Sequence, residues 1–184
     1  MARTYDLVYL AVLAIALAEV AIELWVSRKN ERRLRAEGYR EVAPWVFRAM
    51  VPVYMLAFAA GPLERFGSPD RGAPWRLGIP LLGGLVMAKV LKIWVIRTLR
   101  GNWTKKVFVK EGMPIRTDGP FAWVRHPNYV AMVFEIAALG FLGGTPITGS
   151  VVSLSFGALL LARIATEESA LRRATPYREM MAAR

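Results

Sequence analysis

Residues 7–26 read LVYLAVLAIALAEVAIELWV, an almost unbroken run of apolar side chains. Twenty residues in a helix extend about 30 Å, which matches the thickness of the hydrocarbon core of a bilayer. The run carries Glu19 and Glu23 and has no small-residue cleavage site before the charges that follow it, so it does not fit a removable signal peptide. It predicts a membrane-spanning helix that stays in the mature protein.

Further apolar segments follow, and the whole chain is 55% hydrophobic with a mean hydropathy of +0.32. We therefore predict an all-α fold, a polytopic membrane helix bundle with about five transmembrane helices in a single domain over residues 1–184. Gly83 and Gly84 predict either a close contact between helices or room for a lipid-like ligand. The four further segments are 44–63, 76–99, 128–143, which is short, and 146–165.

Basic residues fall mainly between the apolar segments. The chain has 25 Lys and Arg against 14 Asp and Glu, a net charge of +11. They concentrate in residues 27–43, in residues 97–126 and in the tail after the last segment, so the positive-inside rule predicts an external N-terminus with these three regions in the cytoplasm. Because the charges follow this topology, we expect a lipid bilayer as the partner and no nucleic acid.

The rare residue types narrow the possible chemistry. The absence of cysteine excludes disulfides, thiolate metal sites and cysteine nucleophiles. His126 is the only histidine, so a zinc or iron site held by protein ligands is improbable and we predict no metal.

Several ionisable residues lie inside the apolar segments. Glu19 and Glu23 are one helical turn apart, and Lys89 and Lys92 share a face of the third segment. Pairing across the bundle or snorkelling is the simpler interpretation, with catalysis as the alternative. Glu135 has no basic residue on its own segment and is predicted to line a cavity.

Residues 119–129 read GPFAWVRHPNY and begin the fourth segment. Pro127 suits the first turn of a helix, whose free N–H groups attract a carboxylate or a phosphate. Arg125 can hold a carboxylate with two hydrogen bonds, and His126 can donate or accept a proton near neutral pH. An interfacial belt that only anchors the helix end explains the same local sequence equally well.

The end of the last segment favours a functional site. The helix is predicted to continue past the membrane through Arg163 to Glu167 and Glu168. Both polar clusters would then lie at one membrane face, and a neighbouring pair of helices would bring a glutamate towards Arg125. A solvated helix with internal salt bridges is the alternative for the two glutamates.

Together these features resemble the isoprenylcysteine carboxyl methyltransferase family of integral membrane enzymes. The resemblance rests on Gly119-Pro120-Phe121, on Arg125-His126-Pro127-Asn128-Tyr129 and on Arg163 followed by Glu167-Glu168. Within the family the chain is similar to the bacterial branch associated with type III polyketide synthases, through Trp103-Thr104 and Glu135-Ile136-Ala137 among other residues. The resemblance implies S-adenosyl-L-methionine as cofactor and a bacterial or archaeal cell membrane.

The resemblance also implies a cytoplasmic cofactor pocket within a cofactor-binding and catalytic part at about residues 100–175. Arg125 and Glu168 would face the reacting centre as catalytic residues. The chain departs from the family at Thr175-Pro176-Tyr177, where relatives commonly have Gly-Glu before the tyrosine. The implied cofactor-binding residues are Lys110, Phe121, His126, Pro127, Tyr129 and Glu167.

Three functions stay open at this point. The first is S-adenosylmethionine-dependent O-methylation of a lipophilic small molecule or prenylated acceptor, at an isoprenylcysteine carboxylate or at a hydroxyl of an alkylpyrone or alkylresorcinol. The second is an NADPH-dependent sterol-type membrane reductase, which shares a similar Arg-His-Pro run. The third is a non-enzymatic membrane scaffold. The sequence does not decide the acceptor or the oligomeric state.

Overall fold

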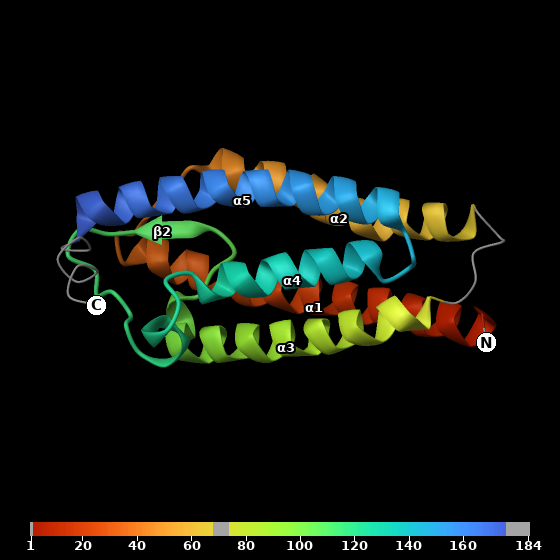
Figure 1. Cartoon of the computed structure of the whole chain (residues 1–184). Helices are drawn as coiled ribbons and strands as arrows, with labels where there is room; N and C mark the ends of the chain where they lie inside the picture. Colours follow the sequence, from red (N-terminus) through yellow and green to blue (C-terminus); the bar gives the residue numbers. More distant parts are fainter. Residues whose placement is uncertain (1, 68–73, 176–184) are drawn as a thin grey trace.

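In the part of the chain that the structure describes, five helices run side by side along one axis and form a bundle (Figure 1). The computed structural model describes residues 2–67 and 74–175. Pro176 and Tyr177, where the sequence departs from the family pattern, lie outside the described residues. The five helices are α1 (Ala2–Ala36), α2 (Pro44–Phe66), α3 (Trp75–Leu99), α4 (Pro127–Phe141) and α5 (Pro146–Ala174).

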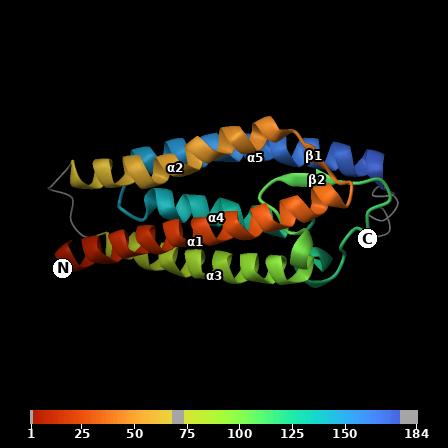
Figure 2. The ribbon, with the colours of Figure 1, turned by 180° about the vertical axis from the view of Figure 1, so that it is seen from behind.

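The predicted membrane bundle is confirmed. Helices α1, α2, α3 and α5 are long and apolar enough to cross a membrane. The α4 helix has 15 residues, which makes it about 22 Å long. It lies in the middle of the bundle, with α5 and α2 on one side and α1 and α3 on the other (Figures 1 and 2).

The C-terminal end of α4 stops inside the bundle, so its last carbonyl groups need partners there. The Tyr5 hydroxyl of α1 donates to the carbonyl of Leu142. The Thr145 hydroxyl donates to the Gly140 carbonyl at 2.6 Å. These two side chains allow the chain to turn into α5 at membrane depth without leaving those carbonyls unpaired.

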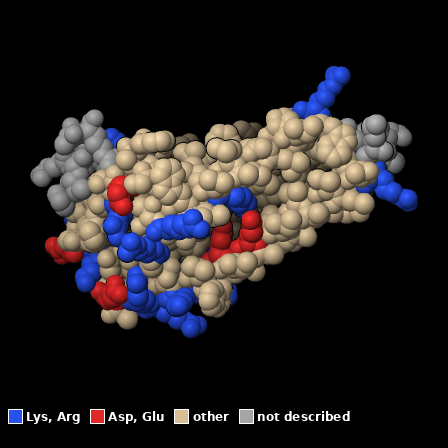
Figure 3. Space-filling view, turned by 90° about the horizontal axis from the view of Figure 1, so that it is seen from below, with Lys and Arg blue, Asp and Glu red and all other residues tan. Residues whose placement is uncertain are grey.

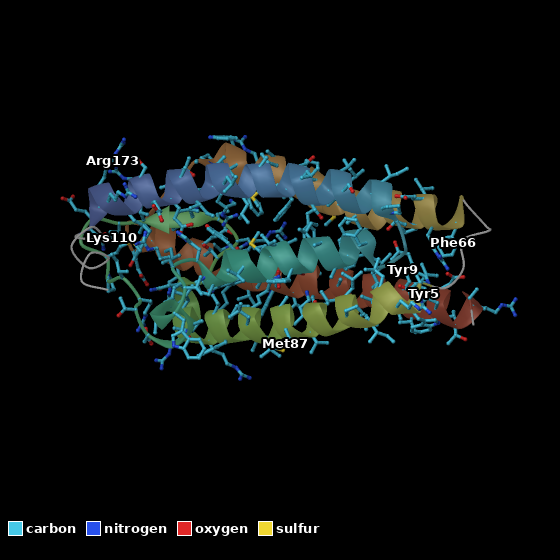
Figure 4. All side chains as sticks on the ribbon, viewed as in Figure 1. Tyr5, Tyr9, Phe66, Met87, Lys110 and Arg173 are labelled. Carbon is cyan, nitrogen blue, oxygen red and sulfur yellow. The ribbon has the colours of Figure 1, made fainter. Side chains whose placement is uncertain are left out.

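The two ends of the bundle differ. The connections after α1 and α3 and the C-terminal end of α5 lie at one end, where Figure 4 shows Lys110 and Arg173, while Tyr5, Tyr9 and Phe66 lie towards the other end. Figure 3 shows Lys and Arg gathered chiefly at the first end, with a group of acidic and basic side chains near the middle of this face and an uncharged surface from there towards the other end. We call the first the loop end. The loops predicted to share one membrane face therefore do so.

The loop end contains a pair of short strands that we did not predict from the sequence. Strand β1 (Arg40–Val42) pairs antiparallel with β2 (Val107–Val109), with Glu41 opposite Phe108. The Gly112 N–H donates to the Ala174 carbonyl at 2.9 Å and ties the following turn to the end of α5. Between α3 and α4 the chain also forms two 3₁₀ turns, η1 (Arg100–Asn102) and η2 (Gly119–Ala122).

Ionisable side chains from three helices and one loop meet inside the bundle. Glu135 of α4 is 1% exposed and accepts hydrogen bonds from Tyr54 at 2.7 Å and Lys89 at 2.6 Å, as well as from Lys92. We call this group the membrane-depth cluster. It confirms the predicted pairing across the bundle, because charges in a low-dielectric interior need partners. Its ionic members are Glu19, Glu23, Lys89, Lys92, Lys105 and Glu135.

The prediction of a close contact between helices at Gly83 and Gly84 is wrong. A Cβ added to either glycine would meet no atom within 4 Å. The close approach occurs instead between α4 and α5, where a Cβ on Gly140 would lie 2.9 Å from the Gly149 Cα. The short turn at residues 142–145 brings these two helices together directly, and a pair of glycines permits that separation.

This contact makes Gly140→Ala a test of the fold. The added methyl would meet backbone that cannot move independently of both helices, so we expect a loss of about 1–3 kcal/mol in the free energy of unfolding. Gly157→Ala is the control, because nothing lies within 4 Å of its added Cβ and alanine favours a helix. Thermal unfolding of the detergent-purified variants measures both. Equal stability of the two variants would contradict the contact.

Candidate functional site

A cavity of about 180 Å³ opens at the loop end, between the β2 loop, the start of α4 and the end of α5. We call it the loop-end cavity. It lies within residues 100–175, the part of the chain to which the family resemblance assigns the cofactor pocket. The side chains that define it most closely are Trp103, Phe121, His126, Tyr129, Arg163 and Glu167.

Arg163 organises one wall of this cavity. The residue is 5% exposed, and its guanidinium donates from Nε to the Tyr129 hydroxyl at 2.9 Å and from Nη2 to the Lys105 carbonyl at 2.6 Å. The Tyr129 hydroxyl in turn donates to the Glu167 carboxylate. Arginine suits this place because several fixed donors can reach partners on different segments at once. This series of hydrogen bonds holds Tyr129 and Glu167 beside each other.

His126 directly precedes α4 and contacts both Tyr129 and Glu168. Its ring stacks on the Tyr129 ring with 5.2 Å between the centroids and 12° between the planes. Its Nε2 lies 3.3 Å from Glu168 Oε1, and the other oxygen of Glu168 accepts from Arg172 at 2.9 Å. The carboxylate can therefore stabilise a protonated imidazole.

The predicted site residues fall into two groups. Lys110 does not line the cavity, because its ammonium donates to the Glu37 carbonyl at 2.8 Å and lies over the Tyr39 ring. Glu168 reaches the site through His126 and is also outside the lining. The predicted residues that line the cavity are Phe121, Arg125, His126, Pro127, Tyr129 and Glu167. What each residue binds stays a prediction.

A second, more apolar cavity of about 160 Å³ lies deeper in the bundle. We call it the inner chamber. Its apolar lining comes mainly from α1 and α2, with Met132 of α4 and Phe156 of α5, and the membrane-depth cluster contributes Glu23, Lys92, Lys105 and Glu135. Val51, which lines it from α2, is 42% exposed on the outer surface, so the chamber approaches the lipid on that side. Burial lowers the pKa of Lys105, against the opposing effect of Glu23 beside it.

The two cavities meet at a shared wall. Trp103, Asn128 and Arg163 line both of them. We call these three residues the partition. None of the three was predicted from the sequence to have a role in the site, although Arg163 marked the helix that carries the glutamates. A tryptophan between the polar residues Asn102 and Thr104 was the available signal, because such a side chain needs an apolar place to pack.

Comparison with known proteins shows the family of the chain. The family model for the isoprenylcysteine carboxyl methyltransferase (ICMT) family matches residues 80–173. The chain belongs to this family. It is also similar to the uncharacterized protein YpbQ of Bacillus subtilis (strain 168), with 26% identity over 160 residues that cover 87% of this chain and 94% of the relative. No solved structure matches the chain.

Membership of the ICMT family has direct consequences. It implies a membrane methyltransferase, and the family uses S-adenosylmethionine as methyl donor. The apolar helices make the chain a multi-pass membrane protein and suggest a lipophilic substrate. The matched residues begin in α3 and end within α5, so they contain the loop-end cavity and the partition.

Arg163→Ala tests the wall that Arg163 builds. The Lys105 carbonyl and the Tyr129 hydroxyl would lose their donor, at about 1–3 kcal/mol for each buried group left unpaired. We expect a lower unfolding temperature in detergent and faster tryptic cleavage after Lys105 and Lys106. Arg172→Ala is the control, because this arginine is exposed and its pair with Glu168 contributes about 0.3–0.5 kcal/mol. If both variants behave alike, Arg163 does not hold the loop.

Proposed function

We propose that the protein is an S-adenosylmethionine-dependent O-methyltransferase that modifies a lipophilic acceptor at the membrane. One observation carries the proposal: a cavity lined by charged, polar and apolar side chains, among them the predicted cofactor residues other than Lys110, meets a mostly apolar chamber at a shared wall. A reaction between a water-soluble donor and a lipophilic acceptor requires two such compartments. The family match favours methyl transfer over NADPH-dependent reduction and over a scaffold.

The chemistry of the loop-end cavity fits the cofactor. Glu167 offers a carboxylate for an ammonium group or for ribose hydroxyls, and Phe121 and His126 offer aromatic surface for an adenine ring. Within the described part of the chain Arg125 has no carboxylate partner, so it can bind the carboxylate of an amino acid. S-adenosylmethionine, when bound, supplies a methyl group on a positively charged sulfur.

The residues of the protein then position the acceptor and limit access of water. We propose that the apolar tail of the acceptor lies in the inner chamber and enters from the bilayer near Val51. Holding the two reactants in one orientation removes much of the entropic barrier of a bimolecular displacement. Buried Trp103 and Arg163 keep the meeting point dry.

Proton transfer depends on the acceptor. A carboxylate needs no base, and Arg125 would orient it, as predicted for a catalytic residue. A hydroxyl must lose a proton, which we assign to His126, whose charged form Glu168 would stabilise across 3.3 Å. Both predicted catalytic residues thus keep a role in the proposal, and Glu168 acts through His126.

We also propose that the loop end lies in the cytoplasm and the N-terminus outside. The basic connections after α1 and α3 share the loop end with the C-terminal end of α5 (Figures 1 and 3). Positive charge next to a span favours the cytoplasmic side. This orientation gives a cytoplasmic cofactor access to the loop-end cavity.

Calorimetric titration with S-adenosylhomocysteine and, separately, with NADPH tests the function. We expect the wild-type protein in detergent to bind S-adenosylhomocysteine and not NADPH. Glu167→Gln and His126→Ala should each weaken binding about tenfold, because each removes a cavity-lining group that binds the ligand.

Glu37→Gln is the matched control, since this exposed glutamate lies outside the cavity and should leave binding unchanged. Binding of NADPH alone would contradict the proposal and indicate an NADPH-dependent reductase. Binding of neither ligand would favour the scaffold.

A further inference from the structure

The last turns of α1 carry a row of cations on one side of the helix. Arg28, Lys29 and Arg32 are exposed, and in the described part of the chain none of them pairs with a carboxylate. Trp25 shares their side, because spacings of three, four and seven residues bring side chains onto one face of a helix. It is 66% exposed, and the Lys29 ammonium lies 6.0 Å from the centre of its ring. We call these residues the outer face of α1.

The opposite side of α1 is occupied by the loop after α3. Ser27 Oγ accepts from the Lys105 backbone N–H at 2.9 Å, and Asn30 donates from Nδ2 to the Trp103 carbonyl at 2.8 Å. Glu23 pairs with the Lys105 ammonium. Figure 2 shows this part of α1 beside the loop that contains β2. These contacts fix the rotation of α1 about its own axis, so the outer face points away from the bundle.

The carboxylates near the end of α1 cannot neutralise the outer face, because they already have cations as partners. Glu31 pairs with Lys106 at 3.1 Å and accepts from Ser27 at 2.7 Å. Glu37 pairs with Arg33 at 3.3 Å. A counter-charge for the outer face therefore has to come from another molecule.

The outer face lies where α1 leaves the apolar part of the membrane. From Leu7 to Ile22 every exposed side chain of α1 is alanine, leucine or isoleucine. Trp25 follows, and the cations come in the next two turns. Tryptophan is typical of the boundary between hydrocarbon and head groups, and basic residues just beyond a span attract anionic lipids. The negative group that this position offers is the phosphate of a lipid head group.

We propose that the outer face of α1 binds the head group of an anionic phospholipid, and that this contact steadies the loop beside the loop-end cavity. Arg28, Lys29 and Arg32 hold the phosphate oxygens, and the Trp25 ring lies against the start of the acyl chains. The inference goes beyond the proposed function and does not depend on it.

Repulsion between like charges links the head group to the loop. Arg28 lies one helical turn before Arg32, and Lys29 lies one turn before Arg33. Like charges at this spacing destabilise a helix. A bound phosphate offsets the repulsion and thereby stabilises the turns of α1 that hold the loop. Residues 102–104 of this loop line the loop-end cavity, so the lipid supports one of its walls.

Quenching of Trp25 fluorescence by brominated lipids tests the contact. The chain has six tryptophans, and Trp25→Phe isolates the signal of Trp25 by difference. In phosphatidylcholine nanodiscs, brominated phosphatidylglycerol should associate with the site about fivefold or more tightly than brominated phosphatidylcholine. The variant that removes the site is Arg28→Gln/Lys29→Gln/Arg32→Gln, which should lose this preference. The matched control is Arg97→Gln/Arg100→Gln/Arg173→Gln, which removes the same charge from other exposed positions and should keep it.

Hydrogen–deuterium exchange of residues 102–106 tests the link to the loop. In the wild type, phosphatidylglycerol should slow this exchange about two- to fivefold, because two repulsive pairs are relieved. The Arg28→Gln/Lys29→Gln/Arg32→Gln variant should exchange slowly in both lipids, since the repulsion is absent from the start. Residues 142–145, which connect α4 to α5, should exchange equally in both lipids.

Equal quenching by the two brominated lipids would overturn the lipid site, as would an unchanged preference in the variant that removes it. A preference for phosphatidylglycerol without slower exchange would overturn the link to the loop, and so would fast exchange of that variant in both lipids. Slower exchange caused by inorganic phosphate in phosphatidylcholine alone would assign the outer face to a soluble anion instead. Neither test contains a cofactor or an acceptor, so a failure of the proposed function leaves these results unchanged.

Discussion

The pairing of Glu135 with Lys89 and Lys92 is the interaction on which the rest of the bundle depends. An unpaired charge at this depth costs several kcal/mol, so the α4 carboxylate requires the two α3 ammonium groups to face it. The same lysines bind Glu19 and Glu23, which fixes α1 as well. Through Glu23 the pairing reaches Lys105, next to the partition tryptophan. One requirement for charge balance therefore positions three helices and the loop beside both cavities.

Features that depend on local sequence could be predicted. Long apolar runs specify helices of membrane length, and prolines mark the beginnings of α2, α4 and α5, where a missing N–H has no cost. The sign of each buried charge also indicated that partners must come from other helices. Features that depend on contacts between distant segments could not be predicted. Strand β1 pairs with β2 across more than sixty residues. The two strands lie in two different connections between helices, and neither connection has a repeating sequence pattern.

The candidate site shows the same division. A glutamate of α5 could be expected near the start of α4 because a helix start and a helix end at one membrane face meet by topology, whereas His126, Tyr129 and Glu167 were named as cofactor residues by the family resemblance. Lys110 was expected at the cofactor; the turn after β2 directs its ammonium to the Glu37 carbonyl, outside the lining of the loop-end cavity, and its role stays a prediction. Trp103 and Asn128 carry no charge, although each stands in a motif on which the family resemblance rests. Their position emerges only when the loop after α3 packs beside the start of α4, which no local pattern encodes.

A membrane methyltransferase has to bring a polar donor and an apolar acceptor together without admitting water. Arg163 addresses this constraint because it is a charged residue whose donors are used on protein oxygens, so it needs little hydration. The wall that it supports can therefore be buried without leaving these donors unpaired. Arg163 and Trp103, which are 5% and 3% exposed, thus separate the two cavities with buried side chains.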